Sequence, residues 1–432
     1  MLTHRPTSSP TSQLDVLRTH LVSISPESSD SLDDEKSYQY RAMEWLLANP
    51  GYNSFSDERK VQRWVIAIIY RSLNGDEWTI KDGWTQQLGV PTDECTWHGV
   101  VCDSTSVLNS ITLSENGLRG EIPHEIGLLA NAKSLVFHTN SIWSFPPSVF
   151  AISPLQVLDL DHNFIQEIPS EMIPPSGGNL TELYLSNNQI TFIPDELFQL
   201  QSVTHLWFAN NQISSSLPSG LGLMEKLVDL DLEHNFFTGS IPADIYSLVN
   251  LQTLYLFDNM LTGTLSQSIS QMKSLKILDL HTNYISGVVP SQIGLLDQLT
   301  ELYLGDNYFV GELPWAQLSS LGLSLQALDV SQNYLNSTIG AEIGMLSNLK
   351  MLRLDSNYRL DVDGVLVSSG IRGQIPQSIG NLKELEELRL DNNYLGSSIP
   401  SSIGNMNKLV SLRLESNNLQ SNIPSSFANL TR

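Results

Sequence analysis

The sequence predicts an α/β solenoid in which stacked coils contribute strands to a concave parallel β-sheet and helices cover the amino-terminal end. Three observations support this fold class. A leucine-rich motif that ends in asparagine recurs along most of the chain. Inside each motif, leucines alternate with polar residues as they do in a strand. Ahead of the motifs, apolar residues follow helical spacing. Repeats with such a short period are typical of solenoid proteins.

The repeat has the form L-x-x-L-x-L-x-x-N and occurs thirteen times in register. Successive asparagines are 23–26 residues apart, except for one interval of 36 residues. A single coil cannot bury its own leucines, so each coil is expected to stack on its neighbours. The asparagines are Asn116, Asn140, Asn163, Asn188, Asn211, Asn235, Asn259, Asn283, Asn307, Asn333, Asn357, Asn393 and Asn417.

The repeat "LVDLDLEHNFFTGSIPADIYSL" shows which positions build the scaffold. Leu230 and Leu232 point into the core and the acids beside them point out, because successive strand residues face opposite sides. Asn235 at the following bend is expected to be buried, and it must then bond the backbone of neighbouring coils. Gly239 permits the next turn, and Pro242 suits an extended segment that needs no hydrogen-bond donor.

Two segments precede the repeats. Residues 1–35 are rich in Ser, Thr and Pro and are predicted to form a disordered tail. Residues 36–104 are predicted to form a helical cap, with helices over residues 38–49 and 57–73. The apolar stripe of the second helix indicates packing over the open end of the solenoid rather than a cofactor site; it consists of Val61, Trp64, Val65, Ile68 and Leu73.

Several motifs resemble those of a known family. "LRGEIPHEIGLL", "ISGVVPSQIGLL" and "IRGQIPQSIGNL" resemble the plant-specific leucine-rich repeat, L-x-G-x-I-P-x-x-I-G-x-L. "DECTWHGVVCD" resembles the amino-terminal cap of those proteins, and "YRAMEWLLANP" with "VQRWVIAIIYRSLNGDEW" resembles the extended cap of algal, diatom-type relatives. The resemblance covers residues 38–432 and implies a leucine-rich-repeat horseshoe or superhelix like the ectodomains of receptor-like kinases.

The repeats are predicted to fill residues 105–432, with two kinds of irregularity. An insertion near residues 358–370 is predicted to be a surface loop. The segments "SFPPSVF", "TFIPDELF" and "WAQLSSLGLS" depart from the consensus and leave the local curvature open. The last repeat stops at "FANLTR" without a polar terminal repeat, so a carboxyl-terminal cap is expected to be absent and the chain to be a fragment.

Covalent features are expected in the cap and on the surface. The resemblance implies that Cys95 and Cys102 form a disulfide that fixes the cap, which is worth about 2–3 kcal/mol. Two reduced thiols in a cytosolic protein are the alternative. If the chain is secreted, N-x-S/T sequons predict glycosylation at Asn179, Asn336 and Asn429.

The residue between the two inward leucines of each repeat forms a column on the concave face, with neighbours roughly 4.8 Å apart. The middle of this column alternates acids with aromatic residues. Aromatic rings beside carboxylates suit sugars, and they also suit cationic peptides through ion pairs and cation–π contacts. The alternative is that aromatic residues simply favour strands. The predicted ligand-binding residues are Asp159, Tyr184, Trp207, Asp231, Tyr255, Asp279 and Tyr303 from this column, and Glu233 and Phe257 from the next outward column.

Arginines take over this column near the end of the chain. Arg353, Arg389 and Arg413 are predicted either to be neutralised by neighbouring acids or to clamp a ligand carboxylate. Five histidines near the same face are spread over separate repeats and predict no metal site.

Charge and motifs exclude several function classes. The chain has 46 Asp and Glu against 23 Lys and Arg, and its net charge of −23 repels nucleic acid and anionic membranes. No apolar run approaches the ~20 residues of a transmembrane helix. No phosphate-binding loop, kinase signature or G-x-S-x-G is present, and acid pairs such as Asp231 with Glu233 lie on an open sheet. No catalytic residue, cofactor or metal is therefore expected.

The expected function is a non-catalytic ligand-binding module, a receptor-like ectodomain that recognises a peptide, protein or glycan on the concave face and works with a co-receptor. The membrane would be reached only through a segment missing from this chain. A secreted inhibitor or adhesion protein and an intracellular interaction scaffold are the alternatives. The first two imply an extracellular or cell-surface location, and the scaffold implies the cytoplasm.

Overall fold

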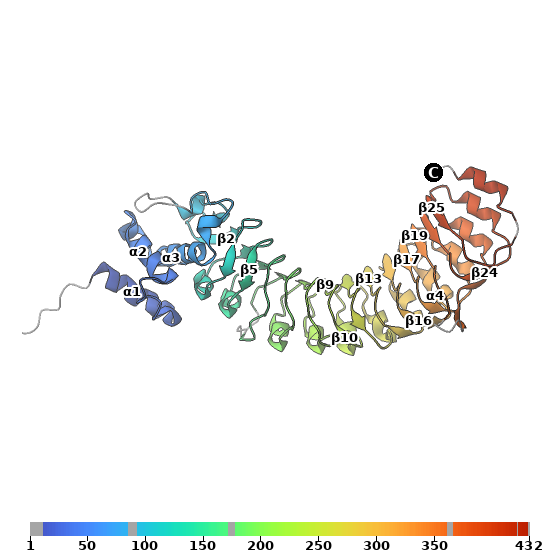
Figure 1. The fold of residues 1–432 in the computed structure, drawn as a ribbon, viewed down its shortest axis with the longest axis horizontal. Helices are drawn as coiled ribbons and strands as arrows, with labels where there is room; N and C mark the ends of the chain where they lie inside the picture. Colours follow the sequence, from blue (N-terminus) through green and yellow to red (C-terminus); the bar gives the residue numbers. More distant parts are fainter. Residues whose placement is uncertain (1–11, 85–92, 172–177, 361–365, 421, 431–432) are drawn as a thin grey trace, which may run out of the picture. The chain divides into compact units, whose positions relative to one another are not determined.

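The computed structural model describes residues 12–84, 93–171, 178–360, 366–420 and 422–430, with side chains described outside residues 358–369. The chain divides into two compact units, Met1–Ile190 and Thr191–Arg432. Figure 1 shows the stacked coils and the helices of the cap. In each unit the coils place a short strand on one side and, in most coils, a 3₁₀ helix on the other. This is the solenoid that the repeat predicts.

Helix α1 (Gln13–Ile24) lies in the segment whose composition predicts a disordered tail. The structure differs from that prediction over residues 12–35, whereas residues 1–11 lie outside the described residues. The helix begins with a reciprocal capping box between Ser12 and Asp15, which satisfies two backbone donors. It also buries an apolar side, and the side chains concerned are Leu17 and Leu21.

Helices α2 (Tyr38–Leu47) and α3 (Asp57–Ser72) match the two helices predicted for the cap. The hydroxyls of Ser37 and Ser56 cap their first turns. Residues 62–69 of helix α3 are all buried, so the helix packs against the rest of the protein on more than its apolar stripe. None of the described helices is long and apolar enough to cross a membrane.

A buried carboxylate joins α3 to the cysteine segment of the cap. Glu94 is 0% exposed and accepts hydrogen bonds from Arg59 Nε at 2.9 Å, from Gln62 Nε2 at 3.0 Å and from Arg63. A buried charge is tolerated only when it is paired in this way. Cys95, the next residue, forms a disulfide with Cys102, as the resemblance implies.

Unit 1 carries the first coils of the solenoid. Its main sheet has the order β1-β2-β4-β6-β7, and every pair is parallel except β1 with β2. Strands β3 (Arg119–Glu121) and β5 (Ser141–Ser144) pair beside it, and 3₁₀ helices η5 (His124–Leu128) and η6 (Pro147–Ala151) follow them. The main strands are β1 (Val100–Cys102), β2 (Leu108–Thr112), β4 (Ser134–Val136), β6 (Val157–Asp159) and β7 (Glu182–Tyr184).

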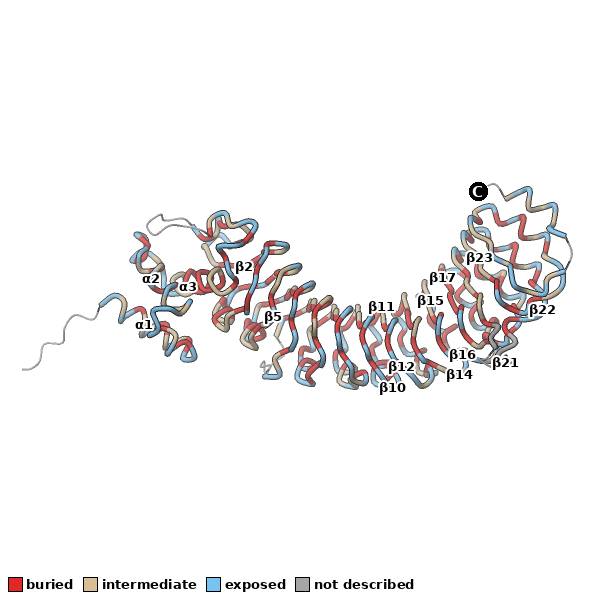
Figure 2. Tube along the Cα trace, in the orientation of Figure 1, coloured by how far each residue is buried: buried red, intermediate tan, exposed pale blue. Residues whose placement is uncertain are grey.

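Unit 2 continues the same pattern with greater regularity. Its main strands pair in parallel and in chain order, and Figure 2 shows buried segments in red along these coils. The strands are β8 (His205–Trp207), β9 (Asp229–Asp231), β11 (Thr253–Tyr255), β13 (Ile277–Asp279), β15 (Glu301–Tyr303), β17 (Ala327–Asp329), β19 (Met351–Arg353), β23 (Glu387–Arg389) and β25 (Ser411–Arg413).

The backs of the coils in unit 2 are formed mainly by five-residue 3₁₀ helices. The irregular segment "WAQLSSLGLS" instead forms the short helix α4 (Trp315–Leu318) followed by η12 (Ser319–Leu321). The other 3₁₀ helices are η7 (Asp195–Gln199), η8 (Ser219–Leu223), η9 (Ala243–Ser247), η10 (Gln267–Gln271), η11 (Ser291–Leu295), η13 (Ala341–Met345), η14 (Gln377–Asn381), η15 (Ser401–Asn405) and η16 (Ser425–Asn429).

Short strand pairs follow the bend after many of the asparagines. Near the predicted insertion the chain forms an antiparallel pair, β20 with β21, while residues 361–365 lie outside the described residues. These strands are β10 (Thr238–Gly239) with β12 (Met260–Leu261), β14 (Ser286–Gly287) with β16 (Tyr308–Gly311) and β18 (Tyr334–Leu335), β20 (Tyr358–Leu360) with β21 (Leu366–Ser369), and β22 (Arg372–Gln374) with β24 (Tyr394–Gly396).

The asparagines of the repeats after the first form the predicted ladder, and Asn116 of the first repeat bonds the backbone of Ile80 in the cap. Asn235 is 5% exposed, and its Nδ2 donates to the carbonyls of Phe208 at 2.9 Å and Glu233 at 3.1 Å. Its Oδ1 accepts from the backbone N–H of Ile213 at 3.1 Å. One side chain thus satisfies backbone groups of its own coil and of the preceding coil, which fixes the stacking.

Candidate functional site

The outward side of the main strands in unit 2, which we call the strand face, carries most of the predicted ligand-binding residues. The strand register places Trp207 beside Asp231, then Tyr255, Asp279 and Tyr303 on successive strands. The alternation of rings and carboxylates in the sequence is therefore an alternation in space. Inward leucines of the same strands are fully buried, so the scaffold holds this column rigidly.

The aromatic members of the column are half-buried rather than fully exposed. Tyr255 pairs with a carboxylate residue on each side, and burial raises the pKa of its phenol to about 12. Tyr303 donates its hydroxyl to Glu301 Oε2 at 2.8 Å, and burial raises its pKa as well. These rings present part of their surface and keep a fixed orientation, which is the arrangement of a preformed binding surface.

Two carboxylates at the centre of the strand face are held in an environment that disfavours their charge. Burial raises the pKa of Asp231 to about 6, and Asp229 adds to the effect. Burial and the neighbouring Asp231 raise the pKa of Glu233 to about 7. Neither side chain forms an ion pair with any described residue. A cation placed here would attract both carboxylates and so offset the cost of burying their charge.

Asp279, one of the predicted ligand-binding residues, makes hydrogen bonds within the protein. It is 6% exposed, and its Oδ1 lies 2.6 Å from Nδ1 of His281 and accepts the backbone N–H of that residue at 3.1 Å. The predicted ligand-binding carboxylate is therefore occupied inside the protein. The hydrogen bond with Asp279 also orients His281. Burial is the largest single effect on this imidazole and lowers its pKa, but Asp279 and the other nearby acids together outweigh burial, so the pKa of His281 is raised.

A ring cluster around Phe257 is the feature that the sequence analysis missed. The imidazole of His281 stacks on Phe257 with 4.4 Å between ring centroids, and the ring of His234 meets Phe257 edge-on at 4.9 Å. His234 in turn contacts Asp258 at 2.5 Å. The sequence shows His234 and His281 in the repeats on either side of the one that contains Phe257, but only the stacking of coils reveals that both rings pack against that phenylalanine.

The remaining two predicted residues lie in unit 1. Asp159 on β6 is in register with Tyr184 on β7, and burial raises the pKa of its carboxyl group. Tyr184 donates to Glu182 Oε2 at 3.0 Å. Unit 1 thus carries a smaller acid–aromatic pair of the same design as the column in unit 2.

The arginine stripe is neutralised for the most part within the protein. Arg353 makes a two-pronged contact with Glu387 at 3.1 and 3.2 Å, and it lies 3.6 Å from Asp329. Arg389 also pairs with Glu387, whereas Arg413 is exposed. Of the two predicted arrangements, neutralisation by neighbouring acids is therefore the one present for Arg353 and Arg389. Glu387, the acid that they share, lies on β23, which is the strand beside that of Arg353 and the strand of Arg389 itself.

Metal binding finds little support in the geometry. Within the described ranges, the group with metal-ligand spacing is Asp93, Glu94 and Cys95. Cys95 is consumed by its disulfide, and Glu94 is bonded to two arginines that would repel a cation. These residues do not fit a metal ion.

Family models match the repeats of both units. A model described as "Leucine rich repeat" matches residues 178–237 and 249–309, and a second, "Leucine Rich Repeat", matches residues 384–406 and 408–430. Among curated relatives, the receptor-like protein kinase BRI1-like 3 of Arabidopsis thaliana is 32% identical over 195 residues, which cover 44% of this chain and 17% of that protein.

A second curated relative is a human channel subunit. The volume-regulated anion channel subunit LRRC8E of Homo sapiens is 31% identical over 127 residues, which cover 29% of this chain and 16% of that protein. The chain therefore spans less than a fifth of the length of either relative.

Two solved structures are similar to this chain over most of its length. The plant peptide hormone receptor RGFR1, solved in complex with RGF2, has a TM-score of 0.71 and 31% identity over 78% of this chain and 55% of that chain. The PEPR1–AtPEP1 structure has a TM-score of 0.70 and 26% identity over 84% of this chain and 53% of that one.

Proposed function

This chain is a leucine-rich repeat protein of the receptor-ectodomain type, and we propose that the strand face of unit 2 binds a basic peptide or a basic segment of a protein. One observation carries the proposal. From β8 to β15, half-buried aromatic rings alternate with carboxylates, and the central Asp231 and Glu233 form no ion pair with a lysine or arginine among the described residues.

The chemistry of this surface favours a cationic ligand. An arginine or lysine side chain between Asp231 and Glu233 would replace their mutual repulsion with attraction. Its aliphatic stem would pack on Tyr255 or Phe257, and its charge would also interact with their ring faces. The net charge of −23 would speed the approach of a basic ligand.

The similarity to RGFR1 supports a peptide ligand, since that receptor is a peptide hormone receptor solved with RGF2. The proposed activity is binding alone, without catalysis, because the acids of the strand face line an open surface. An extracellular location is supported by the Cys95–Cys102 disulfide and by the exposure of all three sequon asparagines.

The proposal is tested by selecting peptides from a random display library on the immobilised full chain. We expect the selected peptides to be rich in Arg or Lys. Tyr255→Ala and Trp207→Ala are each expected to weaken binding at least about tenfold, or 1.4 kcal/mol. Their melting temperatures should change little, because the leucines beneath the strand face remain in place.

The matched control is Tyr394→Ala, which removes a ring that is 54% exposed away from the column. It should leave peptide affinity unchanged. Peptides that bind the Tyr255→Ala and Trp207→Ala variants as tightly as the unmodified chain would place the ligand elsewhere. A large loss of stability in those two variants would instead assign the rings to the scaffold.

A further inference from the structure

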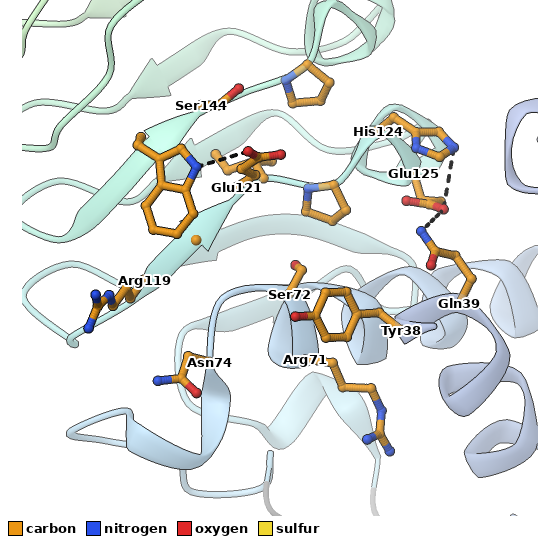
Figure 3. A pocket seen from close by; sticks show the side chains of 15 residues that line it. Tyr38, Gln39, Arg71, Ser72, Asn74, Arg119, Glu121, His124, Glu125 and Ser144 are labelled. Atoms are coloured by element: carbon orange, nitrogen blue, oxygen red, sulfur yellow. Dashed lines mark hydrogen bonds and ion pairs between the residues drawn. The ribbon is translucent and has the colours of Figure 1, made fainter. Parts of the chain in front are cut away.

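A cavity of about 670 Å³ lies in unit 1, apart from the strand face (Figure 3). It opens between the first residues of α2, the end of α3 and the strands β3 and β5. Tyr38, Ser72, Glu121 and Trp143 line it from these elements, and Glu125 lines it from η5. Its volume is within the usual range for small-molecule sites.

The walls of this cavity are fixed by backbone contacts. The N–H of Arg119 on β3 donates to the carbonyl of Leu73 at 3.1 Å. At Gly120, which has φ of 144°, an added Cβ would lie 2.3 Å from the carbonyl oxygen of Ser72. The end of α3 and strand β3 therefore approach as closely as a glycine allows, and the cavity is formed before any ligand arrives.

Two aromatic rings are exposed at the cavity. The side chain of Trp143 is 41% exposed and that of Tyr38 is 47% exposed. Trp143 Nε1 donates to Glu121 Oε1 at 3.0 Å, which fixes the indole and leaves the second oxygen of Glu121 able to accept. Oriented rings of this kind offer flat apolar faces to a ligand.

The carboxylate of Glu125 has one buried oxygen that lacks a hydrogen-bond donor among the described residues. The residue is 0% exposed, and its Oε1 accepts from Ser28 Oγ and Gln39 Nε2, both at 2.9 Å. Its Oε2 is buried and has no hydrogen-bond partner among the described residues. Figure 3 shows this carboxylate at the edge of the cavity, held on one side by Gln39 and His124. A buried carboxylate oxygen of this kind calls for a donor.

The charges around the cavity balance. Glu121 and Glu125 are acidic, and Arg71 and Arg119 are basic. Neither arginine forms an ion pair with a described residue. An anionic ligand would be repelled by the two carboxylates, and a cationic ligand by the two guanidinium groups. The balance favours a neutral ligand that both donates and accepts hydrogen bonds.

We propose that this cavity is a binding site for a neutral saccharide. The C–H face of a sugar ring would stack on Trp143 or Tyr38. Sugar hydroxyls would donate to Glu125 Oε2 and to the second oxygen of Glu121, and they would accept from the arginines. The site requires no residue of the strand face, so it is independent of the peptide-binding proposal.

Saturation-transfer NMR on the full chain tests this with four disaccharides, cellobiose, lactose, maltose and mannobiose, and with choline as a cationic probe. At least one disaccharide should bind with a Kd of about 1 mM or tighter. Trp143→Ala should weaken that binding about tenfold or more. Phe164→Ala is the matched control, since it removes another exposed ring of unit 1, 48% exposed, and should change nothing.

Glu125→Gln provides a second readout, with folding checked by circular dichroism because Glu125 also bonds Ser28 and Gln39. The exposed Trp143 keeps the test decisive if that variant fails to fold. Absence of binding by all four disaccharides would overturn the proposal. So would equal binding by the Trp143→Ala variant, or binding of choline in place of the sugars.

Discussion

Asp231 and Glu233 each contribute to the scaffold through their backbone and to the proposed function through their side chain. Their backbone belongs to the β9 strand and the bend after it, while their carboxylates lie on the strand face with raised pKa values. Holding them ionised costs folding free energy, and this cost persists unless a cation pairs with them. A site that is unfavourable when empty is a common feature of binding surfaces.

The raised pKa values predict a pH dependence of stability. Between pH 4 and about 7 the folded chain binds more protons at Asp231 and Glu233 than the unfolded chain does, so their contribution to the free energy of unfolding falls as pH rises. The Asp231→Asn substitution should remove most of the pH dependence that Asp231 contributes to the free energy of unfolding. Allowing for partial exposure, we expect about 1 kcal/mol of added stability at pH 8 and almost none at pH 4.

Thermal melts of the unmodified chain and of the Asp231→Asn variant across this pH range check the prediction. Asp244→Asn, a change on the 3₁₀ helix η9 away from the strand face, serves as the control. A variant that is equally stable relative to the parent at pH 4 and pH 8 would contradict the raised pKa.

At the scale of elements, each coil is fixed by one strand, one bend and one asparagine. The strands are only three residues long in most coils, too short to be stable alone. Their stability comes from stacking, with leucines buried on one side and asparagine side chains bonding adjacent coils. The same argument explains the cap, where a buried ion pair and a disulfide join the helices to the first strands.

The asparagine ladder predicts a large effect from a small change. Asn235→Ala removes the acceptor for the N–H of Ile213 and a donor to the carbonyl of Phe208, both in the interior. Each unsatisfied buried group costs about 1–3 kcal/mol, so we expect a loss of about 2–4 kcal/mol in the free energy of unfolding. Urea denaturation followed by circular dichroism measures it.

Asn250→Ala is the comparison, because Asn250 is exposed and its Nδ2 donates only to the carbonyl of Glu225. It should change stability by no more than about 0.5 kcal/mol. Similar losses in the two variants would mean that burial of the asparagine in the bend contributes little.

At the scale of the whole molecule, net charge opposes compactness. A surplus of 23 negative charges repels itself, and the repulsion is screened as the Debye length falls from roughly 30 Å at 0.01 M salt to about 8 Å at 0.15 M. The melting temperature is therefore expected to rise by several degrees over this range of sodium chloride. A basic ligand should show the opposite trend and bind more weakly as salt increases.

Calorimetric scans at these ionic strengths measure the first effect, and peptide titrations measure the second. Sucrose at matched osmolality controls for general solute effects, since it does not screen charge. A melting temperature that falls with salt would show that attractive ion pairs, such as those of Glu94 and Glu387, outweigh the net repulsion.

The sequence by itself determined the solenoid, the strand register and the buried asparagines, because a repeat with fixed period leaves one way to bury Leu230 and Asn235. It also placed Trp207, Asp231 and Tyr255 in one column. Only the tertiary structure decided that Asp279 is buried against His281 and that Phe257 is enclosed by two histidines. It alone brought Glu125 and Trp143 to one cavity, and it revealed α1 where composition suggests disorder. The Phe257 cluster and the cavity depend on contacts between residues that are distant in the chain or in different coils, and no local pattern encodes how such neighbours meet. Asp279 and His281 are only two residues apart, but their burial is set by the coils that stack on either side.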